Sequence, residues 1–306
     1  MSETRKGLLL GLAAYAMWGL FPLYFPLMEP AGAVEVLAHR VVWSLITMIA
    51  VVFAVRRRRQ LARLVREPRS LLWLGIAAVV IGVNWGVYIW ATTNEHVVEA
   101  SLGYFINPLV SVLLGVVFFA ERLRGLQWAA LALATAAVVL LTVELGEPPW
   151  VSLALAFSFG TYGLAKKQAD RGAVEGLTVE TMLLAPIALA YLIFLNRTGD
   201  GTFASEGVLH IVLLASLGIV TAVPLLCFGG AATRVPLTVI GFLQYITPTI
   251  QFLLGVVVFR EQMTDGRWIG FLLVWLALVL FSVESLSHHR RQRRAVRRSA
   301  AAPIAA

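Results

Sequence analysis

The stretch "ASLGYFINPLVSVLLGVVFFAERLRGLQW" (residues 100–128) decides the fold, because it recurs 140 positions later as "IGFLQYITPTIQFLLGVVVFREQMTDGRW" (240–268). The two stretches align without a gap, and 10 of their 29 positions are identical. The identities include the LLGVV block and three further pairs: Pro108 with Pro248, Glu121 with Glu261, and Trp128 with Trp268. The sequence therefore predicts that the chain consists of two related halves.

The composition is that of a membrane protein. Of the 306 residues, 59% are hydrophobic and 14% are charged, whereas soluble domains are about 45–50% apolar and about 25% charged. The mean hydropathy is +0.82. The chain has one cysteine, Cys227, which excludes a disulfide framework and a cysteine-based zinc site.

Ten apolar stretches have about the 20 residues that a helix needs to cross a bilayer. They lie at 7–28, 34–55, 71–91, 98–119, 124–143, 149–165, 177–195, 207–229, 236–259 and 267–286. We interpret the first as an uncleaved span, because it is too long for a signal peptide and lacks a small-residue cleavage site. The predicted fold is an all-α polytopic membrane protein with two five-helix repeats, residues 1–145 and 146–286, and a basic tail at 287–306.

Lysine and arginine orient the chain, because cytoplasmic loops are enriched in them. With both termini in the cytoplasm, the inner segments hold 21 of the 25 cationic residues and the outer loops hold three. Arg40 lies inside a span. We therefore predict a protein of the inner (plasma) membrane with both ends inside. Since five is an odd number, the second repeat is inverted relative to the first, an arrangement typical of transporters.

Four stretches carry a resemblance to a known family: "KGLLLGLAAYAMWGLFPLYF" (6–25), "VEVLAHRVVWS" (34–44), "NWGVYIWA" (84–91) and "EASLGYFINPLVSVLLGVVFFAERL" (99–123). Together with the paired blocks, they resemble EamA-type domains of the drug/metabolite transporter superfamily, and more narrowly the RarD permeases. That group is named for chloramphenicol sensitivity. The resemblance covers nearly the whole chain and implies a ten-span inner-membrane permease, but it does not identify the solute.

Two polar stripes at equivalent positions of the repeats are candidates for a translocation pathway. Residues three, four or seven apart share a helix face. One stripe comprises Tyr104, Asn107 and Ser111, and the other comprises Gln244, Thr247 and Gln251. Unpaired polar groups are costly in lipid, so the stripes either line a central cavity or form hydrogen bonds between helices.

Two other spans add amide and aromatic groups to this predicted pathway. Asn84 and Tyr88 lie four residues apart in the third span, and Trp18 lies in the first. Aromatic walls with a few amides suit a moderately apolar solute that carries a polar group. The alternative for any one tryptophan is a place in the belt at the membrane interface.

The second span carries the residues that are least expected in lipid. Glu35, His39 and Trp43 are spaced four apart on one face, and Arg40 lies about 100° round the helix. Arg40 either anchors the span, by pairing with Glu35 or a neighbouring carbonyl or by snorkelling, or faces the cavity as a charge for an anionic group. His39, with a reference pKa near 6.5, is a candidate for proton coupling.

The repeated carboxylates Glu121 and Glu261 each end a span before a short turn. The simpler interpretation is structural, with each carboxylate holding its turn by backbone or arginine contacts. The alternative is a role in gating.

These features favour a secondary transporter that moves a small organic solute by alternating access. An intramembrane enzyme would need catalytic or metal motifs within the spans, yet aspartate occurs only in loops, at 170, 200 and 265. A membrane scaffold or sensor would leave the repeat unexplained. We therefore predict no catalytic residues, no metal and no cofactor. The absence of an ATP-binding P-loop implies that a gradient or a partner supplies energy.

The predicted partners are a small-molecule substrate and anionic lipids at the cytoplasmic face, which juxtamembrane arginines attract. We interpret the arginine runs as topology signals and not as nucleic-acid contacts. The stretch "GRWIG" (266–270) has glycine spacing suited to close helix packing, either in a homodimer or within one chain.

Overall fold

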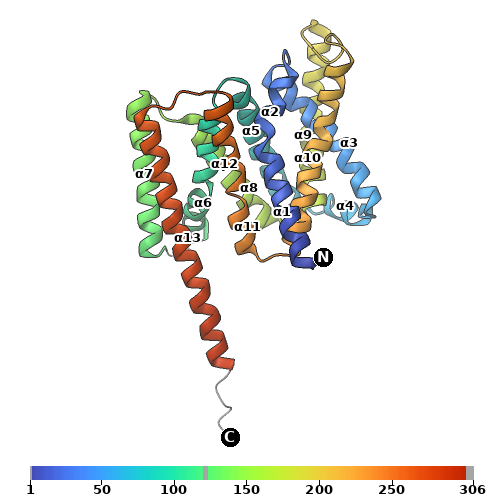
Figure 1. Ribbon diagram of the computed structural model, residues 1–306. Helices are drawn as coiled ribbons and strands as arrows, with labels where there is room; N and C mark the ends of the chain where they lie inside the picture. The colour runs from blue at the N-terminus through green and yellow to red at the C-terminus, as the bar shows by residue number, and fades with distance from the viewer. Residues whose placement is uncertain (1, 120–122, 301–306) are drawn as a thin grey trace. The chain divides into compact units, whose positions relative to one another are not determined.

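The computed structural model describes residues 2–119 and 123–300, and these residues form helices and loops without any strand (Figure 1). Glu121 lies outside the described residues. The helices are α1 (Glu3–Gly19), α2 (Phe21–Tyr24), η1 (Phe25–Met28), α3 (Ala33–Ala54), α4 (Arg58–Leu64), α5 (Pro68–Thr93), α6 (Val97–Phe119), α7 (Gly125–Leu145), α8 (Trp150–Ala169), α9 (Ala173–Thr198), α10 (Val208–Ala232), α11 (Leu237–Leu243), α12 (Ile246–Leu253), η2 (Leu254–Val258) and α13 (Asp265–Ala300).

Each of the ten predicted spans coincides with a helix or a broken helix, but not all of them are apolar enough to count as spans. Within the described residues, eight helices are long and apolar enough to cross a membrane, or nine if the bent α1–η1 segment is one span. The helix that falls short is α8, whose last turn carries Lys166 and Lys167. The chain is thus an all-helical, multi-pass membrane protein, while the count of ten and the inverted repeat stay predictions.

The helices form two compact units. The first unit comprises Met1–Asn107 and Val151–Gln262, and the second comprises Pro108–Trp150 and Met263–Ala306. Each unit draws on both halves of the sequence, and α6 passes from the first unit to the second. These units group segments by contact, so the predicted repeat boundaries remain untested.

The second unit is built on the pairing of α7 with α13, which lie side by side in Figure 1. A Cβ atom on Gly270 would lie 2.9 Å from the Leu141 side chain, and one on Gly266 would overlap the carboxylate of Glu144. Only glycine permits an approach this close. The glycines of "GRWIG" therefore pack within one chain, and the homodimer stays a prediction.

In the first unit, α3 packs against α9 and α10, and α1 packs against α10 and α12. Small residues bring these helices together. The α3–α9 contact uses Ala38, Val41, Ala185 and Ala188. At the α3–α10 contact, a Cβ atom on Gly218 would lie 2.2 Å from the carbonyl oxygen of Trp43. Close backbone approach is the usual route to helix association in lipid.

Two breaks in the helices of the first unit lie next to the buried polar residues. The first span bends by 45° between Gly19 and Phe21, where prolines follow at the starts of α2 and η1. The other break separates α11 from α12 beside Gln244. Pro248 has no N–H to bond the carbonyl four residues earlier, which is that of Gln244, and this missing bond accounts for the break.

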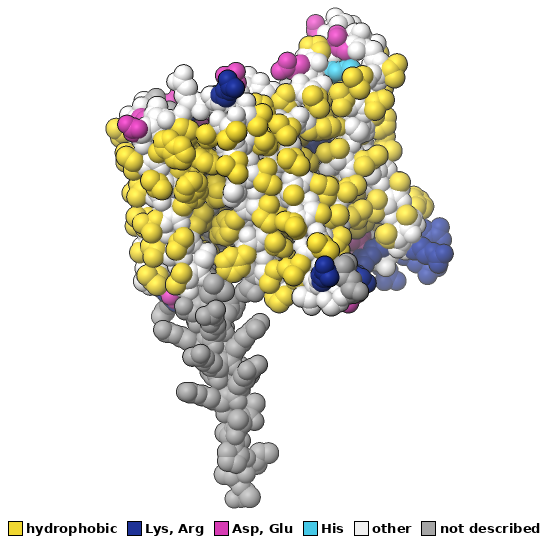
Figure 2. Space-filling view, viewed as in Figure 1, with side chains coloured by type: hydrophobic (Ala, Val, Ile, Leu, Met, Phe, Trp, Pro, Cys, Tyr) yellow, Lys and Arg dark blue, Asp and Glu magenta, His cyan; other side chains and the backbone are white. Residues whose placement is uncertain are grey.

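The outer surfaces of the helices are apolar. Figure 2 shows hydrophobic side chains over their sides, while lysine and arginine side chains gather at the end of the first unit where α4 lies. Exposed side chains such as Phe53, Ile187 and Ile219 are 58–73% accessible. Contiguous apolar exposure of this kind marks a surface that meets lipid.

Candidate functional site

The guanidinium of Arg40 lies in the interior of the first unit, within a group of residues that we call the arginine cluster. Arg40 is 4% exposed, and its Nε donates a hydrogen bond of 3.1 Å to the Thr221 hydroxyl on α10. The guanidinium carbon lies 4.1 Å from the ring centre of Trp85 on α5. It also lies 5.6 Å from the ring of Phe21 and 5.7 Å from that of Phe25. These five residues define the cluster.

Arg40 forms no ion pair with any described carboxylate, and its Nη1 atom is buried without a hydrogen bond. The predicted pairing with Glu35 is not made. The Oε1 atom of Glu35 instead accepts a bond of 2.7 Å from the backbone N–H of Thr202. Arg40 does not snorkel to the interface either, because its whole side chain is buried.

The face of α3 that carries Glu35, His39 and Trp43, about 100° round the helix from Arg40, meets the loop between α9 and α10. His39 stacks on Phe203 with ring centres 4.7 Å apart, and both of its buried ring nitrogens lack hydrogen bonds. Trp43 lies 6.3 Å from the same Phe203 ring. The predicted face of Glu35, His39 and Trp43 thus meets a single loop. The adjacent residues His39 and Arg40 occupy different environments.

Asn84 on α5 is the centre of a buried hydrogen-bond network. Its Nδ2 donates to the Ser158 hydroxyl on α8 at 3.0 Å and to the Leu155 carbonyl at 3.2 Å. Its Oδ1 accepts a bond of 3.2 Å from the hydroxyl of Tyr104 on α6. Asn84 is 1% exposed, so these partners satisfy an amide that would be costly to bury alone.

Gln251 on α12 is a second centre of hydrogen bonds. Its Nε2 donates to the Tyr88 hydroxyl at 2.7 Å and to the Trp18 carbonyl at 3.3 Å, while its buried Oε1 has no partner. The Tyr88 and Tyr104 rings meet edge to face with centres 5.6 Å apart, which joins this group to Asn84. We call Asn84, Ser158, Tyr104, Tyr88 and Gln251 the amide network.

The arginine cluster and the amide network are adjacent, and together they form what we call the central site. The ring of Phe25 lies 6.0 Å from that of Tyr88. Both groups also contribute to one buried apolar cluster, which contains Phe21, Phe25 and Tyr88. The central site therefore combines one cation, several amide and hydroxyl groups, and aromatic rings, which are the kinds of group that line small-molecule sites.

The remaining predicted pathway residues divide into three groups. Thr247 is near the network, where its hydroxyl donates a bond of 2.7 Å to the Tyr15 carbonyl. Asn107 has a buried Oδ1 without a hydrogen bond, and Gln244 is half-buried at the end of α11. Ser111 belongs to the second unit, and its place in the pathway stays a prediction.

Sequence reasoning missed Ser158 and Thr221 and did not assign Phe21 and Phe25 to the site. Ser158 occupies the position 140 residues after Trp18, so a fuller use of the repeat would have pointed to it. Thr221 is one of two hydroxyl residues, with Ser216, in the apolar run of α10, which is a weak signal by itself. For Phe21 and Phe25, an aromatic residue in a membrane span carries no signal of what it packs against.

A second buried charge in the first unit is fully paired. Glu180 on α9 has 0% exposure, and its carboxylate accepts a bond of 2.6 Å from Lys166 on α8. The Tyr162 hydroxyl donates a second bond to it at 3.2 Å. These residues were not predicted as a site, although a carboxylate inside an apolar stretch is itself a signal.

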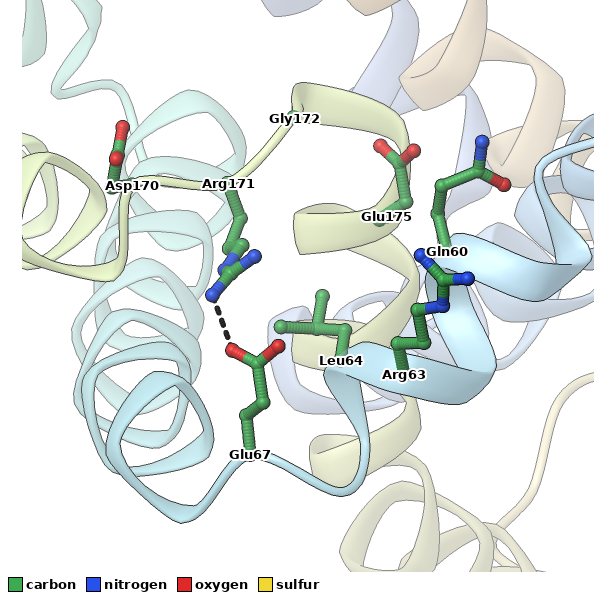
Figure 3. A pocket seen from close by; sticks show the side chains of 8 residues that line it. All are labelled: Gln60, Arg63, Leu64, Glu67, Asp170, Arg171, Gly172 and Glu175. Carbon is green, nitrogen blue, oxygen red and sulfur yellow. Dashed lines mark hydrogen bonds and ion pairs between the residues drawn. The ribbon is translucent and has the colours of Figure 1, made fainter.

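A pocket of about 330 Å³ lies between α4 and the start of α9 (Figure 3). Its walls carry Gln60, Arg63, Leu64, Glu67, Asp170, Arg171, Gly172 and Glu175. Figure 3 shows Arg171 turned toward Glu67, with which it forms an ion pair. Arg57 bonds Glu175 at 2.8 Å, and this hydrogen bond raises the pKa of the Arg57 guanidinium. The ion pairs tie the α3–α5 connection to the α8–α9 connection.

Glu261 caps a helix. Its two carboxylate oxygens accept bonds of 2.6 Å and 3.0 Å from the backbone N–H groups of Val97 and Val98, at the start of α6. A carboxylate at a helix N-terminus also complements the helix dipole. This geometry fits the structural interpretation of Glu261. Among the described residues, no group of three or more His, Cys, Asp or Glu side chains is placed to hold a metal ion.

Comparison with known proteins gives consistent matches over nearly the whole chain. The profile of the EamA-like transporter family matches residues 5–143 and, separately, 149–283. Protein RarD of Streptomyces exfoliatus is 54% identical over 99% of this chain and 95% of its own length. An uncharacterized transporter of Vibrio cholerae is 44% identical over 96% of this chain and 97% of its own. The resemblance seen in the sequence is confirmed.

Two further matches concern a name and the fold. A Pseudomonas aeruginosa protein named chloramphenicol-sensitive protein RarD is 33% identical over 96% of this chain and 99% of its own length. One solved crystal structure superposes with a TM-score of 0.58 at 19% identity, covering 90% of this chain and 97% of that one. At this identity the match shows a shared helical fold and nothing about the solute.

Proposed function

The chain belongs to the EamA-like transporter family, and from that premise we propose that it is a secondary transporter that carries a small organic solute across the plasma membrane by alternating access. The observation that carries the proposal is the convergence of seven helices on one buried site. The residues concerned are Trp18 on α1, Arg40 on α3, Asn84 on α5, Tyr104 on α6, Ser158 on α8, Thr221 on α10 and Gln251 on α12.

Bringing polar groups from several helices into one buried site costs free energy unless another interaction offsets it. Each polar group placed among apolar helices must lose its hydration, and a buried cation costs more than a neutral amide. In a transporter, the bonds that these groups form with the bound solute offset the free energy of burying them. No comparable benefit follows for a scaffold, and we propose no catalytic role for these residues.

The breaks in the helices support movement around the site. Trp18 precedes the bend at Gly19, and Gln251 follows the break between α11 and α12. In many secondary transporters, discontinuous helices flank the solute site and allow one part to move against the other. In the present conformation Asn84, Tyr88 and Gln251 are at most 3% exposed, which corresponds to a state closed over the site.

Proton coupling through His39 is part of the proposal. Both ring nitrogens of His39 lack hydrogen bonds in this conformation, so they are free to exchange a proton when the site opens to water. The test is solute uptake into proteoliposomes with and without an inward pH step, for the unmodified protein and for His39→Gln. Equal rates with and without the step in the unmodified protein would exclude coupling to protons.

The proposed orientation places both termini and the arginines near α4 in the cytoplasm. This location puts a basic surface against the inner leaflet, where anionic lipids would contact it. A homodimer is the remaining proposed partner. Cysteine labelling from each side of intact cells would test the orientation, and the mass of the detergent-solubilised protein would test the dimer.

The decisive experiment compares two substitutions in one helix. Gln251→Ala removes a residue of the amide network, whereas Thr249→Ala changes an exposed threonine two positions away. In proteoliposomes tested with a panel of small organic solutes, Gln251→Ala should lower uptake at least tenfold, on the order of one lost buried hydrogen bond to the solute. Thr249→Ala should transport like the unmodified protein. Equal uptake by both variants would refute the assignment of the site.

A further inference from the structure

We infer that the central site binds an organic monoanion with a flat aromatic body, whose carboxylate pairs with Arg40. This inference rests on the proposed function, because it names the chemical class of the solute that the transporter would carry. It follows from the charge balance of the interior, from the donors of the guanidinium and from the side chains around it.

The charge balance separates Arg40 from the other buried charges of the first unit. Glu35 accepts a backbone N–H, Glu175 pairs with Arg57 and Glu180 pairs with Lys166. For Arg40, the described residues supply one neutral hydroxyl and three aromatic rings. A buried charge without a counter-charge is costly, so a ligand of opposite sign should bind this site in preference to a neutral one.

The donors of Arg40 match a carboxylate. The Nε atom bonds Thr221, which fixes the plane of the guanidinium, while Nη1 is buried and makes no hydrogen bond. An arginine fork binds the two oxygens of a carboxylate with a geometry that lysine cannot reproduce. A single guanidinium balances one negative charge, which favours a monoanion over a dianion.

The surroundings of the guanidinium specify the rest of the solute. The rings of Trp85, Phe21 and Phe25 lie against the guanidinium itself, and the Tyr88 ring packs edge-on to that of Phe25, so the charge is enclosed by aromatic side chains. Aromatic rings pack well on one another, and a water-poor wall strengthens the ion pair beside it. The buried Oε1 of Gln251 is an acceptor without a partner. A hydroxyl or N–H group at the far end of the solute would satisfy it.

The test uses matched pairs of probes that differ in charge alone. The purified full-length protein in detergent is titrated with benzoate, phenylacetate, hydroxyphenylacetate and indole acetate, and separately with the corresponding primary amides. Binding is measured by the rise in melting temperature with ligand concentration, which follows from mass action. The variants are Arg40→Gln, Arg40→Lys and, as a control, Arg66→Gln at an exposed arginine outside the site.

The expected result is that at least one acid binds and that its amide binds about 30-fold more weakly or not at all, as for loss of one buried charge pair. Arg40→Gln should abolish the preference for the acid, Arg40→Lys should keep it at reduced affinity, and Arg66→Gln should leave it unchanged. The melting transition of each variant without ligand shows whether that variant is folded.

Two results would overturn the inference. Equal stabilisation by an acid and its amide, or a preference that survives Arg40→Gln, would show that Arg40 does not receive the anion. Stabilisation by no acid in the panel would exclude the aromatic monocarboxylate class. Neither result removes the proposed function, which would fail if the unmodified protein took up no solute of the panel into proteoliposomes.

Discussion

Helices α3 and α9 begin with the same four residues. Gly-Ala-Val-Glu occupies 32–35 before and within the first turn of α3, and it recurs at 172–175 in α9, at the 140-residue shift of the repeat. Glu35 and Glu175 are both buried, with exposed fractions of 4% and 5%. Each holds a connection elsewhere in the first unit: Glu35 bonds the α9–α10 loop, and Glu175 bonds the α3–α4 junction.

Five residues further on, the two helices differ. Position 40 is an arginine among aromatic rings, and position 180 is a glutamate bonded by Lys166 and Tyr162. Both charges are buried, but only Glu180 has a charged partner among the described residues. The difference teaches that burial alone does not identify a functional charge. The paired charge secures two helices, whereas the charge left without a counter-ion is the one suited to a solute.

The largest expected effect comes from breaking the pair in α9. Lys166→Met leaves Glu180 buried without its cation, and we expect the free energy of unfolding to fall by about 3 kcal/mol. Unfolding in detergent, followed by tryptophan fluorescence, measures this loss. The double variant Lys166→Met with Glu180→Leu removes both charges and should recover most of it. A single variant as stable as the unmodified protein would contradict a structural role for the pair.

The next effect concerns the first turn of α3. Glu35→Ala leaves the N–H of Thr202 without its acceptor, which should cost about 2 kcal/mol of unfolding free energy, within the range for an unsatisfied buried donor. The same unfolding assay applies. Glu35→Gln keeps an acceptor oxygen and is the control. Equal losses in both variants would show that the charge of Glu35, and not its acceptor, holds the loop.

The equivalent substitution in α9, Glu175→Ala, should lower the free energy of unfolding by less. Glu175→Ala frees Arg57, whose side chain is 51% exposed and returns easily to water. We expect a loss below about 1 kcal/mol, as for other exposed ion pairs. Raising the salt concentration should reduce the difference in unfolding free energy between the variant and the unmodified protein. A loss as large as that of Glu35→Ala would mean that the two first turns are energetically equivalent.

The smallest effect on stability is expected at Arg40 itself. Arg40→Met gives up the bond to Thr221 and the contact with Trp85, but it also removes a buried charge that lacks a counter-ion. These contributions oppose one another, so the unfolding free energy should stay within about 1 kcal/mol of the original. Solute uptake should nevertheless be lost. A loss of stability as large as that of Lys166→Met would make Arg40 a structural anchor and end the contrast between the two helices.

Part of the central site could be predicted from sequence. Helical spacing placed Tyr104, Gln251 and Asn84 on inward faces, since polar residues are costly against lipid. The Glu35–Arg40 pair, one of the anchors expected for Arg40, is not formed, because Glu35 bonds the backbone N–H of Thr202 instead. The partners Ser158 and Thr221 could not be found in this way. They come from α8 and α10, more than 70 residues along the chain from Asn84 and Arg40.

The sequence by itself determined the helical class, the position of the apolar segments, the repeated block and the family, because hydropathy and helical periodicity are local properties of the chain. The tertiary structure alone decided that Glu35 bonds Thr202, that Glu180 is neutralised by Lys166 and that Arg40 is not neutralised at all. The physical reason is that the cost of a buried charge depends on which side chains of distant segments pack around it. The spacing of residues along one helix carries no information about those neighbours.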